Sequence, residues 1–309
     1  MRPINNIKLT FSFILLSITF CSGFKGVDIK KSYCTCEWKN KHNEKGMGRI
    51  IGGDEADDGE YPFMAGLFEE ADGLVESVQC GATILGSLQL LTAAHCVNPS
   101  SNYSVVIGVL GLFDPDLTNI RKVSKIDIHP DFDENTLAGD IALLTVDHPL
   151  DFSSRRIGPV CLGQKKRKIH SEFRIVGWGC LSNMSTPQYL QEVSVDEYDY
   201  DNCYSRGLID KHDRKQFCTL SRNKGPCLGD SGGPVLLFDA EKETYTLEGI
   251  VSKGPEDCRT LPSVHIDIHH PEYIDWITER SIDQICWIKN LPDDRDWTSR
   301  RKNILEYVN

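Results

Sequence analysis

The sequence of 309 residues contains no apolar run of membrane length after its first 23 residues, no internal repeat and no low-complexity tract. A membrane-spanning helix needs about 20 consecutive apolar residues, so no transmembrane span is predicted after residue 23. With 40% hydrophobic and 26% charged residues, the composition is typical of a globular protein and not of a disordered one.

Positive charge is also scarce. The chain has 45 acidic and 34 basic residues, which gives a formal net charge of −11. Nucleic acids and anionic membranes attract basic surfaces, so we expect neither as a partner. The exception is Lys165-Lys166-Arg167-Lys168, where we favour a solvated loop over a polyanion site. No residues show metal-ligand spacing, and we expect no metal and no other cofactor.

The N-terminal segment predicts secretion. Lys8, the mainly apolar run from Leu9 to Phe20 and small residues up to Gly23 follow the order of a secretory signal peptide, which we place at residues 1–23. A signal anchor is the disfavoured alternative. The chain has twelve cysteines, which in an extracellular protein indicate a disulfide framework. If Cys21 leaves with the signal peptide, one cysteine has no partner within the chain.

After residue 50 the chain has many short runs of apolar and β-branched residues separated by turn residues, which predicts an all-β sandwich or barrel. A helix is predicted at Pro271–Arg280, whereas the stretch Asp196–Tyr204 is ambiguous. Residues 24–49 have the composition of an exposed linker, and residues 285–309 that of a charged extension. The strands that we expect cover residues 104–110, 123–128, 141–146, 173–178 and 245–251.

Three motifs point to catalysis by a serine. In Gly229-Asp230-Ser231-Gly232-Gly233-Pro234, the glycines permit a tight turn that presents the Ser231 hydroxyl beside free backbone N–H groups. A serine needs a base, and His95 is the candidate because small residues and Cys96 flank it. Asp140 stands at the head of an apolar strand, where a carboxylate needs a partner, and so it is the candidate to orient the base.

Together, in the order His, Asp, Ser, these motifs resemble the signatures of chymotrypsin-like serine proteases. The resemblance covers residues 50–284. It implies two antiparallel Greek-key β-barrels, an active site in the cleft between them and a C-terminal helix. It also implies that Ser231 attacks the scissile carbonyl and that His95 is the general base. Asp140 would orient His95, and the N–H groups of Gly229 and Ser231 would form the oxyanion hole.

Arg49-Ile50-Ile51-Gly52-Gly53 resembles the activation site of this family. The resemblance implies that residues 24–49 are a propeptide and that cleavage after Arg49 frees the Ile50 ammonium, which then pairs with Asp230. Each buried charge needs the other, so the pair acts as a switch. A zymogen is therefore predicted.

Disulfides are implied by the same resemblance. Phe173 and Leu237 replace both halves of a further family bridge. The segment from Cys34 to Asn40 is similar to the propeptide of secreted insect proteases, venom and salivary enzymes among them, but has too few cysteines for a clip domain. The implied pairs are Cys80 with Cys96, Cys203 with Cys218, Cys227 with Cys258, Cys161 with Cys34 or Cys36, and Cys286 with the remaining propeptide cysteine, which leaves Cys180 unpaired.

The resemblance places Gly225 at the floor of the specificity pocket, where trypsin-like relatives carry an aspartate. An uncharged pocket disfavours Arg and Lys, so chymotrypsin-like or elastase-like preference is predicted. Alternatively, Glu256 and Asp257 at the rim attract a basic residue. Lys253 stands where an aromatic residue usually lies, so we expect extended subsites that prefer acidic residues or bind weakly. The other residues implied to line the cleft are Pro226, Leu228, Ser252, Gly254 and Ser263.

Such a pocket does not suit the Arg49-Ile50 bond, which implies a separate trypsin-like activating protease. We further expect protein or peptide substrates, protein inhibitors of proteases, a monomer and glycosylation at Asn102 and Asn183. The alternative from another class is a catalytically silent homologue that binds a partner. The presence of all three triad residues argues against it.

Overall fold

The structure is a computed structural model. All the residues that it describes belong to one compact unit of the chain, residues 34–309. Among these residues, no helix is long and apolar enough to cross a membrane. The predictions for the signal peptide, the cleavage site at Arg49, the basic cluster, Asn183 and Glu256 lie outside the described residues. The described residues are Cys36, 53–71, 74–75, 78–112, 119–163, 171–181, 184–209, 214–240, 242–255 and 257–286.

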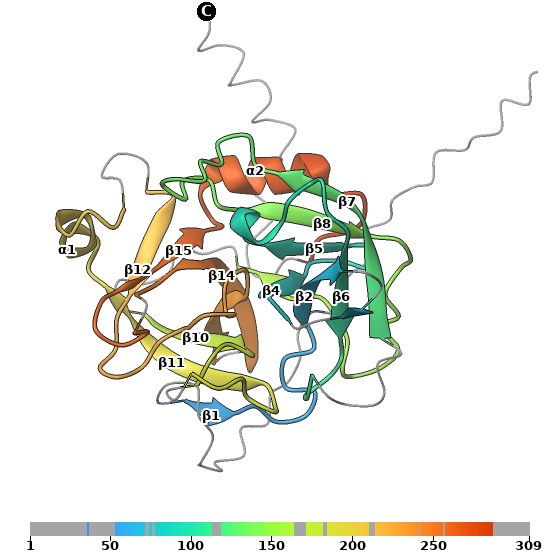
Figure 1. Cartoon of the computed structure of the whole chain (residues 1–309), viewed down its shortest axis with the longest axis horizontal. Helices are drawn as coiled ribbons and strands as arrows, with labels where there is room; N and C mark the ends of the chain where they lie inside the picture. The colour runs from blue at the N-terminus through green and yellow to red at the C-terminus, as the bar shows by residue number, and fades with distance from the viewer. Residues whose placement is uncertain are drawn as a thin grey trace, which may run out of the picture. The chain divides into compact units, whose positions relative to one another are not determined.

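The first half of the described chain forms a closed antiparallel barrel (Figure 1). Its six strands are hydrogen-bonded in the order β2, β4, β5, β8, β7, β6, and pairing of β2 with β6 closes the barrel. Short β3 (Leu74–Val75) pairs with β2. The barrel strands are β2 (Met64–Ala71), β4 (Cys80–Ile84), β5 (Gln89–Thr92), β6 (Tyr103–Ile107), β7 (Ile120–Ile128) and β8 (Ala142–Val146).

The second half forms another closed barrel, in the order β11, β10, β13, β14, β15, β12, with β11 paired to β12. Two short strands attach to it: β1 (Asp54–Glu55) is antiparallel to β11, and β9 (Cys161–Leu162) is parallel to β14. The prediction of two antiparallel barrels is confirmed. The barrel strands are β10 (Glu172–Gly177), β11 (Gln191–Tyr198), β12 (Gln216–Thr219), β13 (Pro234–Asp239), β14 (Thr244–Lys253) and β15 (Ser263–Asp267).

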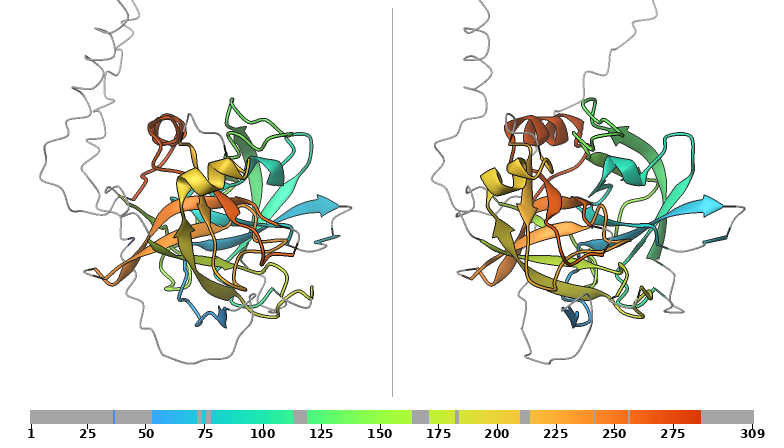
Figure 2. Two further views of the ribbon diagram at one scale, coloured as in Figure 1. Left: turned by 90° about the vertical axis from the view of Figure 1, so that its left-hand side faces the viewer. Right: turned by 60° about the vertical axis from the view of Figure 1, so that its left-hand side comes forward.

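Helix α2 (Pro271–Arg280) has the predicted bounds and starts at a proline, whose missing N–H costs nothing in the first turn. It buries Tyr273 and Trp276, whose rings lie 5.1 and 5.2 Å from that of His129, which follows β7. Figure 2 shows from two further sides that α2 and β1 lie at opposite ends of the described unit.

The ambiguous stretch 196–204 divides at Asp199, whose side chain caps the short α1 (Tyr200–Ser205) after β11 ends. The strand predicted over residues 104–110 stops at Ile107, because Gly108 has a φ of 66°. A short 3₁₀ helix, η1 (Ala94–Cys96), follows β5.

Phe173 packs in a core cluster of the second barrel together with Leu237. The antiparallel register of β10 and β13 pairs Arg174 with Leu236, so Phe173 and Leu237 lie opposite each other. Apolar packing therefore occupies the place of the bridge that the chain lacks.

The disulfides between described residues match the implied pairs: Cys80–Cys96, Cys203–Cys218, Cys227–Cys258 and Cys36–Cys161. Cys286 is buried and disulfide-bonded, so folded structure extends past the predicted boundary at residue 284. Its partner lies outside the described residues, and the pairing with Cys34 stays a prediction. Cys180 is a free thiol, as expected.

Two of these disulfides close loops of similar length, with sequence separations of 16 and 15 residues. We expect Cys80→Ala/Cys96→Ala and Cys203→Ala/Cys218→Ala each to lower the free energy of unfolding by about 3 kcal/mol, because each variant frees a similar loop in the unfolded chain. Urea unfolding of the two variants measures this. A difference above about 1.5 kcal/mol between them would contradict a cost set by loop closure.

Candidate active site

The first barrel brings His95 and Asp140 together. His95 lies in η1, and Asp140 follows Gly139, whose positive φ of 62° turns the chain into β8. Asp140 is fully buried. Its Oδ1 accepts a hydrogen bond from the His95 backbone N–H at 2.9 Å, and its Oδ2 lies 2.8 Å from His95 Nδ1. A carboxylate accepts, so this contact places the imidazole proton on Nδ1 and leaves Nε2 as a base.

A third donor to Asp140 comes from the second barrel. The Ser252 hydroxyl, near the end of β14, donates to Asp140 Oδ2 at 2.6 Å. The predicted substrate-binding role of Ser252 stays a prediction, and the structure adds a second role, in which its hydroxyl holds the carboxylate that faces His95. This role was missed because the two residues are 112 positions apart in the chain.

Ser231 lies in the loop before β13, and this loop is packed against the strand that leads to His95. Gly232 has a φ of 77°, and a Cβ there would lie 2.2 Å from Thr92 Oγ1 and 2.4 Å from the Gly81 carbonyl oxygen. The Ser231 carbonyl accepts a hydrogen bond from the Gly81 N–H at 2.7 Å. Only glycine permits this approach, which carries the serine to the end of β5 beside η1.

No hydrogen bond joins Ser231 Oγ to His95 Nε2 in the part of the chain that the structure describes. Catalytic hydrogen bonds are often long in proteins without substrate and shorten in the complex. The backbone N–H groups of Gly229 and Ser231 donate to no described residue, whereas that of Asp230 between them donates to the Cys227 carbonyl. Gly229 has a φ of 96°. The two free donors are what an oxyanion hole requires.

Asp230 is fully buried beside this loop. Its Oδ1 accepts from the Gly179 N–H at 2.9 Å and its Oδ2 from the Cys227 N–H at 2.8 Å. Burial raises the pKa of Asp230 to about 6, against the lowering effect of these two hydrogen bonds. Among the described residues, no cation pairs with it.

The space for this carboxylate comes from Gly177 and Gly179, which were not among the predicted site residues. A Cβ at Gly177 or Gly179 would lie 2.1 or 2.4 Å from an Asp230 side-chain oxygen. The signal in the sequence is the pair of glycines around Trp178.

The residues predicted for the specificity pocket lie together. A Cβ at Gly225 would lie 3.3 Å from the Cys258 carbonyl oxygen and 3.9 Å from Ser263 Oγ; one at Gly254 would lie 3.1 Å from Ser263 Oγ and 4.0 Å from the Pro226 carbonyl oxygen. None of these neighbours is charged.

The predicted entrance and rim residues Leu228 and Asp257 are both exposed, but only Asp257 has its side chain held by hydrogen bonds. Leu228 is 58% exposed, in keeping with a place at the entrance. Asp257 is fully exposed, but its oxygens accept hydrogen bonds from Arg259 and Thr260 in its own loop. These bonds lower the pKa of Asp257. Of the two acids considered for a basic substrate residue, Asp257 is thus held in a local turn.

Cys180 and Lys253 complete the surroundings. The Cys180 N–H donates to the Leu228 carbonyl, and its side chain packs against the Cys227–Cys258 disulfide. Lys253 ends β14, and its Nζ donates to the Thr136 carbonyl at 3.2 Å, in the loop before Asp140. Burial lowers the pKa of Lys253.

A metal site does not follow from the cluster of Cys80, His95 and Cys96, whose ligand atoms lie within 4.8 Å of one another. The two sulfurs are bonded to each other and offer no thiolate.

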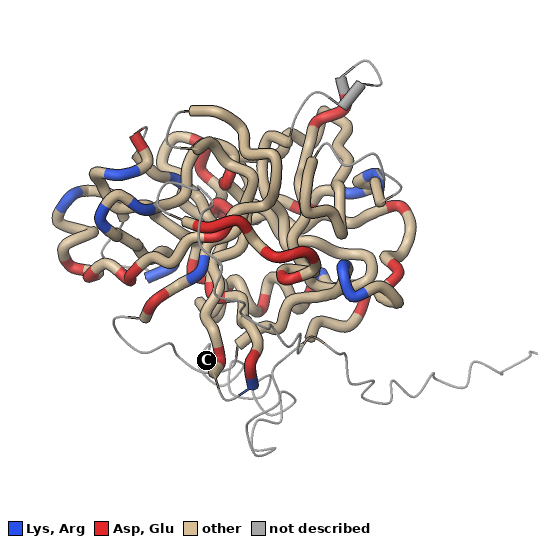
Figure 3. Tube along the Cα trace, turned by 90° about the horizontal axis from the view of Figure 1, so that it is seen from below, with Lys and Arg blue, Asp and Glu red and all other residues tan. Residues whose placement is uncertain are grey.

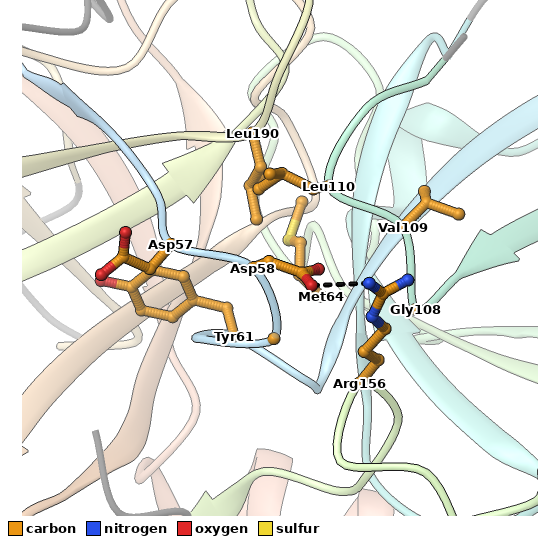
Figure 4. A pocket seen from close by; sticks show the side chains of 10 residues that line it. Asp57, Asp58, Tyr61, Met64, Gly108, Val109, Leu110, Arg156 and Leu190 are labelled. Carbon is orange, nitrogen blue, oxygen red and sulfur yellow. Dashed lines mark hydrogen bonds and ion pairs between the residues drawn. The ribbon is translucent and has the colours of Figure 1, made fainter. Parts of the chain in front are cut away.

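A separate depression lies near β1 (Figure 4). Tyr61, Met64 and Leu190 contribute to its lining, and Arg156 and Asp58 form an ion pair of 2.6 Å there. None of the predicted catalytic or substrate-binding residues lines it. In Figure 3 acidic segments run across the middle of the view as well as along its outer loops, and basic segments lie among them.

Comparison with known proteins agrees with this geometry. The family model described as Trypsin matches residues 50–277. The chain is 30% identical over 272 residues to venom serine protease 34 of Apis mellifera, covering 83% of this chain and 63% of that protein. It is 31% identical over 255 residues to the proclotting enzyme of Tachypleus tridentatus, covering 76% and 66%.

A mammalian relative is covered more fully: serine protease 28 of Mus musculus is 30% identical over 234 residues, 70% of this chain and 83% of that protein. The chain thus spans just under two thirds of the first two relatives. The family model covers well over half of the chain and begins at the residue after Arg49. The chain therefore belongs to the trypsin family of serine proteases.

Proposed function

We propose that the protein is a secreted serine endopeptidase that hydrolyses peptide bonds through an acyl-enzyme intermediate. The observation that carries this proposal is the buried Asp140 carboxylate, 2.8 Å from His95 Nδ1, beside a glycine-rich loop that presents Ser231. The presence of all three triad residues favours this function over a catalytically silent homologue.

Each group has a defined task in this mechanism. Ser231 Oγ attacks the scissile carbonyl while His95 Nε2 takes its proton, and the N–H groups of Gly229 and Ser231 stabilise the oxyanion. His95 then protonates the leaving amine, and water repeats the attack on the acyl-enzyme. Asp140 holds the imidazole tautomer and stabilises the imidazolium, and Ser252 fixes the carboxylate from the second barrel.

Replacement of the nucleophile tests this mechanism. Ser231→Ala removes the only atom that can form the acyl-enzyme, so we expect loss of labelling by a fluorophosphonate probe and a fall in kcat of about 10⁶-fold. Ser124→Ala, at an exposed position of β7, is the matched control and should label like the parent. Absence of labelling in the cleaved parent chain would favour the silent homologue.

Activation after Arg49 is the second part of the proposal, and the state of Asp230 supports it. A pKa raised to about 6 means that the buried carboxylate is costly to ionise in the uncut chain. Its destabilising effect sets in as the pH rises from the unfolded value near 4 through about 6, and it persists at pH 7. An ammonium brought beside Asp230 removes this cost, which links the Ile50 amine to an ordered Ser231 loop.

A variant at the activation site tests this switch. Arg49→Ala should prevent cleavage by an added trypsin-like protease, and we expect at least about 100-fold less fluorophosphonate labelling than in the cleaved parent, because Asp230 gains no partner. N-terminal sequencing should find Ile50 in the cleaved parent only. Equal labelling of the uncut variant and the cleaved parent would refute the zymogen.

We also propose that cleavage follows apolar residues. The neighbours of Gly225 are uncharged, and Asp257 is engaged in its own loop. Burying a substrate ammonium or guanidinium without a countercharge is heavily penalised. The proposed pocket therefore suits chymotrypsin-like or elastase-like substrates, and trypsin-like cleavage directed by Glu256 remains the alternative.

A single substitution at the pocket floor should reverse this preference. Gly225→Asp places a carboxylate at the pocket floor, and we expect the ratio of kcat/KM for Arg over Phe or Leu substrates to rise by at least about 100-fold. Gly225→Asn is the matched control, with nearly the same shape and no charge. A parent enzyme that already prefers Arg would contradict the apolar pocket.

The setting follows from these proposals. The disulfides suit an extracellular protein. An apolar pocket does not bind Arg49, so a separate trypsin-like protease must cleave the Arg49-Ile50 bond. One relative is named as a proclotting enzyme. We propose protein substrates, regulation by protein inhibitors and a monomeric state, which size-exclusion chromatography with light scattering tests. Asn102 is exposed, as a glycosylated residue must be.

A further inference from the structure

The end of β14 provides an open strand edge beside the catalytic residues. β13 begins at Pro234, which pairs with Ile250, so beyond this point only β15 pairs with β14. Val251 exchanges hydrogen bonds with Gly232 and Gly233 of the Ser231 loop. The next residues, 252–254, thus run from the Ser231 loop to the pocket wall at Gly254 with one edge free for an extended peptide.

Lys253 lies in this segment, and its side chain crosses to the first barrel. Its Nζ reaches the Thr136 carbonyl at 3.2 Å, four residues before Asp140. This is the one hydrogen bond that the ammonium makes within the described chain, and no described carboxylate forms an ion pair with it. An ammonium has three donors, so two are uncommitted.

None of the described acidic groups around the Thr136 loop forms an ion pair with Lys253, although the charge of Asp140 favours the Lys253 ammonium through space. Asp140 is held by His95 and Ser252, and Asp133 accepts hydrogen bonds from Asn135 and Thr136 in its own turn. Asp131 and Glu272 both pair with Lys215. The half-buried Lys253 ammonium therefore has no carboxylate in contact with it among the described residues, and it lies near the His95–Asp140 pair.

We propose that Lys253 binds a carboxylate of the substrate, at the second or fourth residue before the scissile bond. This inference rests on the proposed protease function and names its substrate class: peptides with Asp or Glu at one of these positions. Side chains alternate along an extended peptide. If the residue before the scissile bond points into the pocket at Gly225, the second and fourth point to the opposite face, toward the loop that Lys253 contacts.

The contribution of a carboxylate here is that of a charge-assisted hydrogen bond in a partly desolvated place. Such a bond corresponds to roughly tenfold in affinity. Because the pair stays near solvent, added salt should weaken it. The third residue before the scissile bond, which points away from this face, should show no preference.

The experiment measures peptide binding without turnover. Ser231→Ala, cleaved after Arg49, is titrated with fluorescent peptides that share an apolar pocket residue and carry Glu or Gln at the second, third or fourth position. We expect Glu to lower Kd about tenfold at the second or fourth position and not at the third. Lys253→Met, which keeps an apolar stem, should abolish the difference. Lys122→Met, whose native side chain is 71% exposed on β7, should keep it.

Equal Kd values for Glu and Gln peptides at all positions would overturn the proposal, as would a Glu preference that survives in Lys253→Met. The same peptides, with Ser231 intact, should show the preference in kcat/KM. Failure of Ser231 to react with a fluorophosphonate concerns the protease function alone. The binding comparison still decides whether Lys253 selects acidic residues.

Discussion

The buried carboxylate of Asp140 is the point on which the site depends, because it joins the two barrels. Its oxygens take donors from η1 of the first barrel and from β14 of the second. A carboxylate with no solvent contact is stable only if its lone pairs are satisfied. The same hydrogen bonds that meet this requirement fix His95 in one tautomer and set β14 beside it. Structural need and catalytic need are met by one set of contacts.

Asp230 presents the opposite case, a buried carboxylate without a cation among the described residues. Two backbone N–H groups bind it, and glycines at positions 177 and 179 make room for it. The two acids differ in their partners: a histidine and a serine side chain bind Asp140, whereas only backbone N–H groups bind Asp230. Asp140 has its hydrogen-bond donors in the uncut chain, whereas Asp230 has no cationic partner among the described residues, and the proposed cleavage after Arg49 would supply one.

Sequence alone predicted much of this because the chemistry is local in the chain. The glycines around Ser231 are required by close backbone approach, the small residues around His95 are buried, and both sets appear as short motifs. The bounds of α2 followed from Pro271 and the apolar face. What the sequence could not predict were contacts between distant positions: Ser252 with Asp140, Lys253 with Thr136, and the glycines that accommodate Asp230. The early end of β6 at Ile107 depends on the backbone conformation of a single glycine.

The Cys36–Cys161 disulfide gives this protein a second kind of continuity. Cys36 lies before Arg49 in the chain, and Cys161 lies after it, in β9 beside the second barrel. The disulfide therefore joins the two pieces that cleavage of the Arg49-Ile50 bond would produce. Hydrolysis there would turn one polypeptide into two without changing the number of particles in solution. The mass of the native protein would change only by that of one water molecule. A gel run under reducing conditions would separate the two pieces.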